Sequence, residues 1–340
     1  MRESNLEPIG ADEAKELYLR QRENEVSEST IQAHHYRLSH FVKWCDEVEE
    51  IDNLNELGGR DLQRYKIWRR DDGNLNNVTM STQLSTLTVF IRWCESIDAV
   101  QEGLNEKILT PKLSPKEDRK TVMLAPEAAE ELLTHLRRFE FGTRTHAFIE
   151  LLWHTGIRIG AAHGIDLDDY SSEMQTIELC HRPESGTRLK NKNEGERFVA
   201  LSPAVCDILD AYIKVKRKNE TDEHGRKPLF TSRAGRPSKT TLRDSLYKIT
   251  RPCVYSQKCP HDRIPETCEA MEHNKASKCP SNVNPHAIRR GSITHHLSKD
   301  VPDTVVSDRM NVSLDVLEKH YDQRGERQKA EQRRQYLSNI

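Results

Sequence analysis

The sequence has little of what a membrane or exported protein needs. A membrane-spanning helix takes about 20 consecutive apolar residues, and no stretch of these 340 residues approaches that length. The first residues, Met1 to Asn5, also lack the apolar core of a signal peptide. We therefore expect a cytoplasmic protein without membrane contacts.

The chain also lacks an excess of charge of either sign. Its 52 lysines and arginines stand against 54 aspartates and glutamates, which gives a net charge of −2. That balance excludes a uniformly basic protein that coats nucleic acid, but DNA binding needs only one basic face. Most charge runs are ordinary solvated surface. The candidates for such a face are Arg69, Arg70, the segment 214–218, Arg233, Arg236, Lys239 and Arg243.

Apolar residues make up 35% of the chain, which is enough for modest cores, and a chain of this length suits two domains. Apolar side chains recur with helical spacing over residues 11–22, from Ser29 onward, over 60–70 and over 79–97. Few apolar residues follow in 106–121, which contains Pro and several lysines, the composition of a linker.

The remaining residues, 122–340, indicate helices with a small sheet. A helix is expected from Pro126, since proline suits a first helical turn. Short strands are expected at 176–180 and 197–201, followed by a helix over 203–218. The predicted fold is therefore mainly α (α+β): a helical bundle, then a mostly helical domain with a small antiparallel sheet.

Four residues of this second part form a set suited to cutting a phosphodiester. Arg158 follows a Thr-Gly pair, His286 and Arg289 lie in the segment 284–292, and Tyr321 comes last. A phosphodiester under attack gathers negative charge, which the planar, permanently charged guanidinium of arginine binds bidentately. His286 lies three residues before Arg289, so both project from one face of a helix. Tyr321 would be the nucleophile, and His286 would donate to the phosphate or accept the tyrosine proton.

This ordered set resembles the tyrosine recombinase (phage integrase) family. The resemblance implies a site-specific DNA recombinase or integrase that cuts and rejoins duplex DNA through a 3′-phosphotyrosyl intermediate. It implies no cofactor for catalysis, double-stranded DNA as the partner, and a homo-tetramer on paired sites. It also implies a core-binding domain over 1–105 that clamps the duplex and a catalytic domain over 122–340. A C-terminal helix over 328–340 would then reach a neighbouring subunit.

The resemblance further implies a lysine that protonates the leaving 5′-oxygen. In the family this lysine lies in a turn between two strands. Counting back five residues from Arg197, as the family pattern suggests, gives Lys192. Lys190 in the same turn is the alternative.

Two positions depart from the family pattern. Ala161 stands where an acidic residue is usual, and Val312 stands where a second histidine or a tryptophan is usual. The valine removes one hydrogen bond to the phosphate, for which His295, His296 and His320 are the candidate replacements. These departures favour an alternative, a catalytically weak DNA-binding protein on the recombinase fold. A type IB topoisomerase, which shares the chemistry, is a further alternative.

An insertion over residues 253–279 is polar and contains four of the eight cysteines: Cys253, Cys259, Cys268 and Cys279. It has too little apolar content to pack by burial alone, and four thiolates on one Zn²⁺ would supply the missing stability. We therefore expect a structural zinc site, with a Cys₃His site that uses His261 as the alternative and free thiols as the other interpretation. The insertion resembles cysteine-bearing insertions in an archaeal branch of the family. Without strand chemistry, the same cluster would suit a zinc-finger-type DNA-binding regulator.

Overall fold

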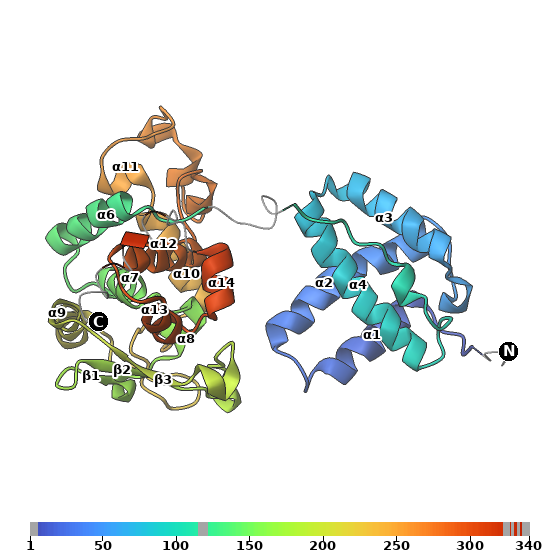
Figure 1. Ribbon diagram of the computed structural model, residues 1–340, viewed down its shortest axis with the longest axis horizontal. Helices are drawn as coiled ribbons and strands as arrows, with labels where there is room; N and C mark the ends of the chain where they lie inside the picture. The colour runs from blue at the N-terminus through green and yellow to red at the C-terminus, as the bar shows by residue number, and fades with distance from the viewer. Residues whose placement is uncertain (1–5, 115–121, 322–326, 328–329, 332–333, 335–340) are drawn as a thin grey trace. The chain divides into compact units, whose positions relative to one another are not determined.

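The chain forms two compact units, residues 1–120 and 121–340, each described by itself (Figure 1). The computed structural model describes residues 6–114 and 122–321, together with 327, 330, 331 and 334. Residues 115–121 of the expected linker, and most of the helix expected over 328–340, lie outside the described residues.

The first unit is a helical bundle with an aromatic core. Its long helices are α1 (Ala11–Arg22), α2 (Glu28–Glu47), α3 (Gly59–Gly73) and α4 (Asn77–Ser96). Side-chain oxygens cap the N-termini of α2 and α4. The Ser27 hydroxyl accepts from the Thr30 N–H at 3.2 Å, and the Asn76 side chain accepts from the Thr79 N–H at 2.9 Å. Ile108 is buried in the same core, so this unit extends beyond residue 105.

The second unit combines short helices with one small sheet. Its helices are α6 (Pro126–Phe139), α7 (Arg144–Thr155), α8 (Ile159–Gly164), α9 (Pro203–Ala211), α10 (Lys239–Ile249), α11 (Pro252–Tyr255), α12 (Pro285–Ser298), α13 (Asp303–Met310) and α14 (Leu314–His320). In Figure 1 the sheet lies at one edge of this unit and the segment around α11 at the opposite edge. None of the described helices in either unit has both the length and the apolar composition of a membrane span.

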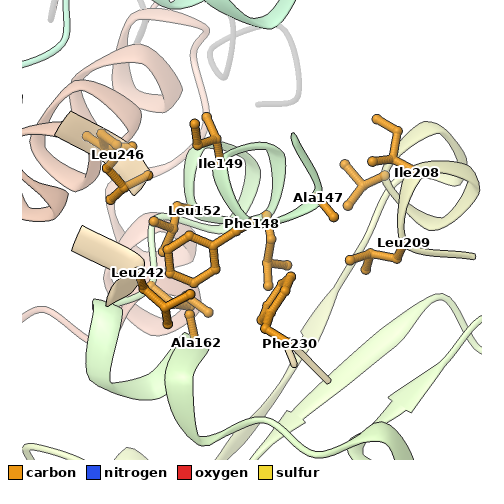
Figure 2. Packing of buried hydrophobic residues seen from close by; sticks show 14 of the residues in the cluster. Ala147, Phe148, Ile149, Leu152, Ala162, Ile208, Leu209, Phe230, Leu242 and Leu246 are labelled. Atoms are coloured by element: carbon orange, nitrogen blue, oxygen red, sulfur yellow. The ribbon is translucent and has the colours of Figure 1, made fainter. Parts of the chain in front are cut away.

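Helix α7 forms the centre of the second core. Phe148 and Leu152 of this helix lie between Leu209 of α9 and Leu242 of α10 (Figure 2). The ring of Phe148 meets Phe230 edge to face, with 5.0 Å between the ring centroids. Because α7 is packed on several sides, the turn at its C-terminal end, which leads to Arg158, is held firmly.

The sheet is antiparallel, in the order β1 (Tyr170–Ser171), β2 (Thr176–Leu179) and β3 (Arg197–Ala200). Ile177 pairs with Val199, and both face the core. The two-residue strand β1 was not expected, because it is too short to give a period-two pattern. The helix expected over 203–218 instead ends at Ala211 and passes into a π-helix over 212–216. The predicted mainly α (α+β) class is confirmed.

Candidate active site

A glycine turn carries Arg158 from α7 to the start of α8. Gly156 ends α7 in the left-handed region, at φ 60°, and its N–H donates to the Leu152 carbonyl at 2.9 Å. A Cβ on Gly156 would also lie only 2.6 Å from the sulfur of Met310, so glycine allows the end of α13 to approach. Arg158 then occupies the position before the first residue of α8 and is half-buried.

Helix α12 carries the second arginine into the protein interior. The Asn284 side chain caps this helix by accepting from the Ala287 N–H at 2.9 Å, and Pro285 occupies the first turn. His286 is exposed, whereas Arg289, one turn later, is only 2% exposed. The helix thus presents a histidine at the surface above a buried guanidinium.

Backbone carbonyls hold both arginines. Nη1 of Arg289 donates to the carbonyl oxygens of Gly156 at 2.6 Å and Met310 at 2.8 Å. Nη2 of Arg289 donates to the carbonyl oxygen of Asn311 at 3.4 Å. Nη1 of Arg158 donates to the same Asn311 carbonyl at 3.1 Å. Neither arginine makes an ion pair with a carboxylate of the described residues. Carbonyl dipoles fix the guanidinium groups without cancelling their charge.

The pKa values of Arg158 and Arg289 are those expected of two cations that lie close together. Burial, first, and the neighbouring Arg158, second, lower the pKa of Arg289, which stands at about 10 with Tyr321 acting in the opposite direction. Burial also lowers the pKa of Arg158, again opposed by Tyr321. Both shifts disfavour the charged forms of the two arginines, so an anion bound between them would be stabilised.

Tyr321 lies beside these arginines at the end of α14. Its carbonyl accepts from the Thr294 hydroxyl at 3.1 Å, which fixes the tyrosine against α12. The ring is 5% exposed and meets His286 edge-on at 6.3 Å between ring centroids. The Arg290 guanidinium lies 5.8 Å from the ring centroid. The structure therefore brings together Arg158, His286, Arg289 and Tyr321, which the sequence separates widely.

The turn between β2 and β3 borders this group. Nδ2 of Asn191 donates to Oδ1 of Asn311 at 2.6 Å, which ties the turn to the residue whose carbonyl holds both arginines. Lys192 follows directly, exposed and with a φ of 51°. Lys190 is exposed as well. The turn that carries both lysines thus lies next to the arginines, and the choice between Lys192 and Lys190 stays a prediction.

Val312 has a structural role in the turn that ends α13. The Asn311 N–H donates to the Asp308 carbonyl at 3.2 Å and the Val312 N–H donates to the Ser307 carbonyl at 3.0 Å, the paired bonds of a Schellman turn. Val312 is buried in one apolar cluster with Val306, the contact that accompanies such turns.

The candidate replacements for the missing histidine lie in other surroundings. His295 packs on Trp153, with 5.5 Å between ring centroids, and Nδ1 of His296 lies 2.8 Å from the Ser292 carbonyl. The side chain of His320 lies outside the described residues. Ala161 is half-buried against the core.

Two arginines near the site were not among the predicted site residues. Arg197, at the start of β3, donates from Nε to the Arg309 carbonyl at 3.0 Å and from Nη1 to the Gly195 carbonyl at 2.8 Å. Arg309 donates to the carbonyls of Ala200 at 2.7 Å and His154 at 3.2 Å. In the sequence Arg197 served only as a reference position for the lysine, because nothing local indicates that the strand begins beside α13.

The four cysteine sulfur atoms of the insertion are not gathered at metal-binding distance. Among the described residues, the one set of three or more potential ligands with all ligand atoms within 4.8 Å of one another is Asp169, Glu178 and Cys180. Asp169 already binds Arg182 at 2.6 Å. In the insertion, burial raises the pKa of Cys253, Arg251 lowers it, and the nearby thiols of Cys279 and Cys259 raise it, so three of the four lie in one neighbourhood. Nε2 of His261, the alternative ligand, lies 2.8 Å from the Ser281 hydroxyl.

Two of the basic residues that were candidates for a DNA-binding face instead bind other side chains of the protein. Arg69 is buried and donates to Gln83 at 2.9 Å, and Arg236 pairs with Asp222 at 2.9 Å and with Asp166. Their inclusion in a basic DNA-binding face was therefore wrong, since each charge is used inside the protein. The other candidates are exposed, apart from the half-buried Arg217 in the segment 214–218: Arg70, Lys214, Lys216, Lys218, Arg233, Lys239 and Arg243.

Comparison with known proteins gives the family. Residues 123–323 match the phage integrase family, and residues 16–96 match the phage integrase N-terminal SAM-like domain. Tyrosine recombinase XerC of Natranaerobius thermophilus is 22% identical over 281 residues, which is 81% of each chain. Tyrosine recombinase XerC of Staphylococcus haemolyticus is 24% identical over 278 residues, 82% of this chain and 80% of its own.

Solved structures give the same fold. The Tn1549 transposon integrase in complex with transposon right end DNA matches with a TM-score of 0.68 and 14% identity, over 96% of this chain and 99% of that one. A λ integrase dimer bound to a COC′ core site matches with a TM-score of 0.63 and 13% identity, over 94% and 97%. Because the family match covers more than half of the chain, the protein belongs to the phage integrase family, the tyrosine recombinases. The family predicted from the residues is confirmed, and with it a place among the site-specific DNA recombinases.

Proposed function

We propose that this protein is a site-specific DNA recombinase that uses Tyr321 to cut and rejoin duplex DNA. The observation that carries the proposal is the meeting of Arg158, Arg289 and Tyr321, from three separate segments, around the end of α13. Two guanidinium groups held by carbonyls offer their charge to a phosphate. The family's chemistry needs no cofactor, and these arginines supply the positive charge that a metal supplies elsewhere.

In the proposed reaction the Tyr321 oxygen attacks the scissile phosphorus. The bond from phosphorus to the 5′-oxygen breaks, and the cut strand is held through a 3′-phosphotyrosyl bond. Arg158 and Arg289 bind the non-bridging oxygens, where charge develops. His286 accepts the tyrosine proton or donates to the phosphate, and Lys192 gives the leaving oxygen a proton. Attack on the same phosphorus by the 5′-hydroxyl of a partner strand reverses these steps.

The proposed assembly is the one that the family resemblance implies. The first unit would clamp the duplex from the side opposite the catalytic unit. Four copies would then act on two paired sites, since strand exchange needs a cutting tyrosine for each strand. Double-stranded DNA is the proposed partner, and the exposed residues Lys239 and Arg243 of α10 are candidates for contacts with its backbone.

We also propose that the insertion binds a structural Zn²⁺ through Cys253, Cys259, Cys268 and Cys279. The support is that most of its residues are exposed, so that burial contributes little to its stability. Arg251 joins it to α10 by donating to the carbonyls of Lys248 and Ala270. Metal analysis of protein purified without added zinc should give one zinc per chain, reduced in Cys259→Ser. Cys180→Ser is the matched control and should keep the zinc. Zinc-free protein of unchanged stability would contradict this proposal.

Covalent trapping on a nicked duplex tests the proposed reaction. The site is first mapped by sequencing the duplexes that the protein captures covalently from a pool of random sequence. A nick beside the scissile phosphate lets the short leaving fragment diffuse away, so the protein–DNA adduct accumulates on a denaturing gel. Tyr321→Phe should give no adduct and should bind the duplex as the wild type does.

The outcomes separate the alternatives. Wild-type protein that binds DNA but gives no adduct would favour the catalytically weak DNA-binding protein, to which the buried Val312 points. An adduct formed without a paired second site, with strand relaxation and no exchange, would favour a topoisomerase. A zinc-dependent regulator would lose DNA binding with Cys259→Ser and would be unaffected by Tyr321→Phe.

A further inference from the structure

The end of α13 holds three arginines on three successive carbonyls. The Arg309 carbonyl accepts from Nε of Arg197 at 3.0 Å, the Met310 carbonyl from Arg289 at 2.8 Å, and the Asn311 carbonyl from Arg158 at 3.1 Å. The last carbonyls of a helix have no partner within it, and the negative end of the helix dipole favours cations there. Two of the three arginines belong to the proposed site, and the third, Arg197, is bound to the same turn in the same way.

Arg197 has no anionic partner among the described residues. Its hydrogen bonds go to the carbonyls of Arg309 and Gly195, and no hydrogen bond of its Nη2 to a described residue is present. Burial, first, and then the neighbouring charges of Arg289, Arg158 and Arg309 together lower the pKa of Arg197 to about 10. Arg197 therefore lies within the positive field of the two site arginines.

We propose that Arg197 is a third phosphate-binding arginine of this site, which offsets the donor lost at Val312. The inference rests on the proposed function. The valine position is occupied by the Schellman turn and cannot supply a polar group without disturbing it. The guanidinium of Arg197, on β3, binds the first of the three successive carbonyls, and its charge would take over the part of the hydrogen bond that the family's second histidine gives.

Arg309 offers the matched control. It lies in the same cluster, but its guanidinium bridges the Ala200 carbonyl of β3 and the His154 carbonyl of α7. Burial lowers its pKa as well. Its contacts fasten the strand to the helix, so its loss should disturb the site without removing a group that touches phosphate.

The test compares a normal scissile phosphate with a methylphosphonate, which lacks one negative charge. Single-turnover cleavage is measured on the mapped nicked duplex for the wild type, Arg197→Gln and Arg309→Gln. On the phosphodiester, Arg197→Gln should be slowed roughly 10²-fold, the usual loss for one preorganised donor. On the methylphosphonate, the ratio of the wild-type cleavage rate to the Arg197→Gln rate should be at least tenfold smaller than on the phosphodiester. Arg309→Gln should show the same deficit on both substrates.

An equal deficit of Arg197→Gln on both substrates, or no deficit on either, would overturn the inference. If Arg197→Gln does not fold, Arg197→Lys carries the same comparison, because it keeps the charge but loses the bidentate geometry. Its deficit should also be smaller on the methylphosphonate. Wild-type protein that forms no adduct on any duplex would instead refute the proposed function, which keeps the two failures distinct.

Discussion

Single residues set the charge of this site. Arg158 and Arg289 are held by carbonyl dipoles, and no carboxylate of the described residues pairs with either. A carboxylate would fix the same geometry but would cancel the charge that a phosphate needs. The cost is visible in Arg289, whose pKa falls to about 10 through burial first and the neighbouring Arg158 second. DNA would relieve this repulsion by supplying the anion.

Replacing Val312 by histidine should destabilise the protein without improving cleavage. Val312 is 6% exposed and belongs to the Schellman turn, so a polar ring there would lack partners. Burying such a group costs about 1–3 kcal/mol by mutational data. Urea unfolding of Val312→His measures this cost, and Val316→His, at a position 41% exposed, is the control and should change stability by less than about 0.5 kcal/mol. Faster cleavage by Val312→His would show that the ring reaches the phosphate.

At the scale of elements, the end of α13 joins the parts of the site. Its last carbonyls bind arginines from β3, α12 and the start of α8, and the Asn311 side chain binds the turn between β2 and β3. Asn311 itself lies in the left-handed region, at φ 50°. The conformation of this one turn therefore positions groups that are distant in sequence.

Substitutions of Asn311 should separate backbone conformation from the side-chain link. Asn311→Gly tolerates the positive φ and keeps the carbonyl, so stability should stay close to that of the wild type. Asn311→Val places a β-branched residue in a left-handed conformation, which costs about 1–2 kcal/mol. Denaturant unfolding measures both. Equal stability of the two variants would mean that the turn does not require its observed conformation.

The elements that sequence predicts well are those with a local cause. Helix α1 follows from apolar spacing, and the start of α6 from Pro126. The set Arg158, His286, Arg289 and Tyr321 also follows from local motifs, and the structure brings these residues together, while their catalytic roles stay predictions. Strand β1 has only two residues and leaves no period to detect.

The residues that sequence does not predict depend on tertiary contacts. Arg197 lies beside the site only because β3 begins against the last turn of α13. Arg236 cannot serve in a DNA-binding face only because it pairs with Asp166 and Asp222. No local sequence pattern predicts that Arg197 contacts α13 or that Arg236 contacts the two aspartates. The zinc ligands, the lysine that donates the proton and the tetramer remain predictions.

At the scale of the whole molecule, two half-buried histidines should make stability depend on pH. Burial, first, and the neighbouring Arg309, second, lower the pKa of His154 to about 4. Burial also lowers the pKa of His163 to about 4, with Lys239 as the next cause. Nε2 of His154 accepts from the Ser202 N–H at 3.2 Å, which requires the neutral ring. These histidines stay neutral in the folded protein where the unfolded chain takes up protons.

Stability should therefore fall as the pH drops from about 6.5 toward 4, and it should be flat with respect to these groups above about pH 7. The unfolded chain binds more protons in this window, so the free energy of unfolding rises with pH. Thermal unfolding at pH 7 and pH 5 measures the difference. His154→Gln should reduce it, while His224→Gln, at an exposed position, should leave it unchanged. An undiminished difference in His154→Gln would contradict this assignment.

The proposed role of Tyr321 is tested most directly by identifying the residue that becomes covalently joined to DNA. The covalent adduct from the nicked duplex is digested with protease and nuclease, and the peptide bearing the remaining nucleotide is sequenced by mass spectrometry. The nucleotide should be attached to Tyr321 through its 3′-phosphate. Attachment to another residue, or through a 5′-phosphate, would contradict the site described around α12, α13 and α14.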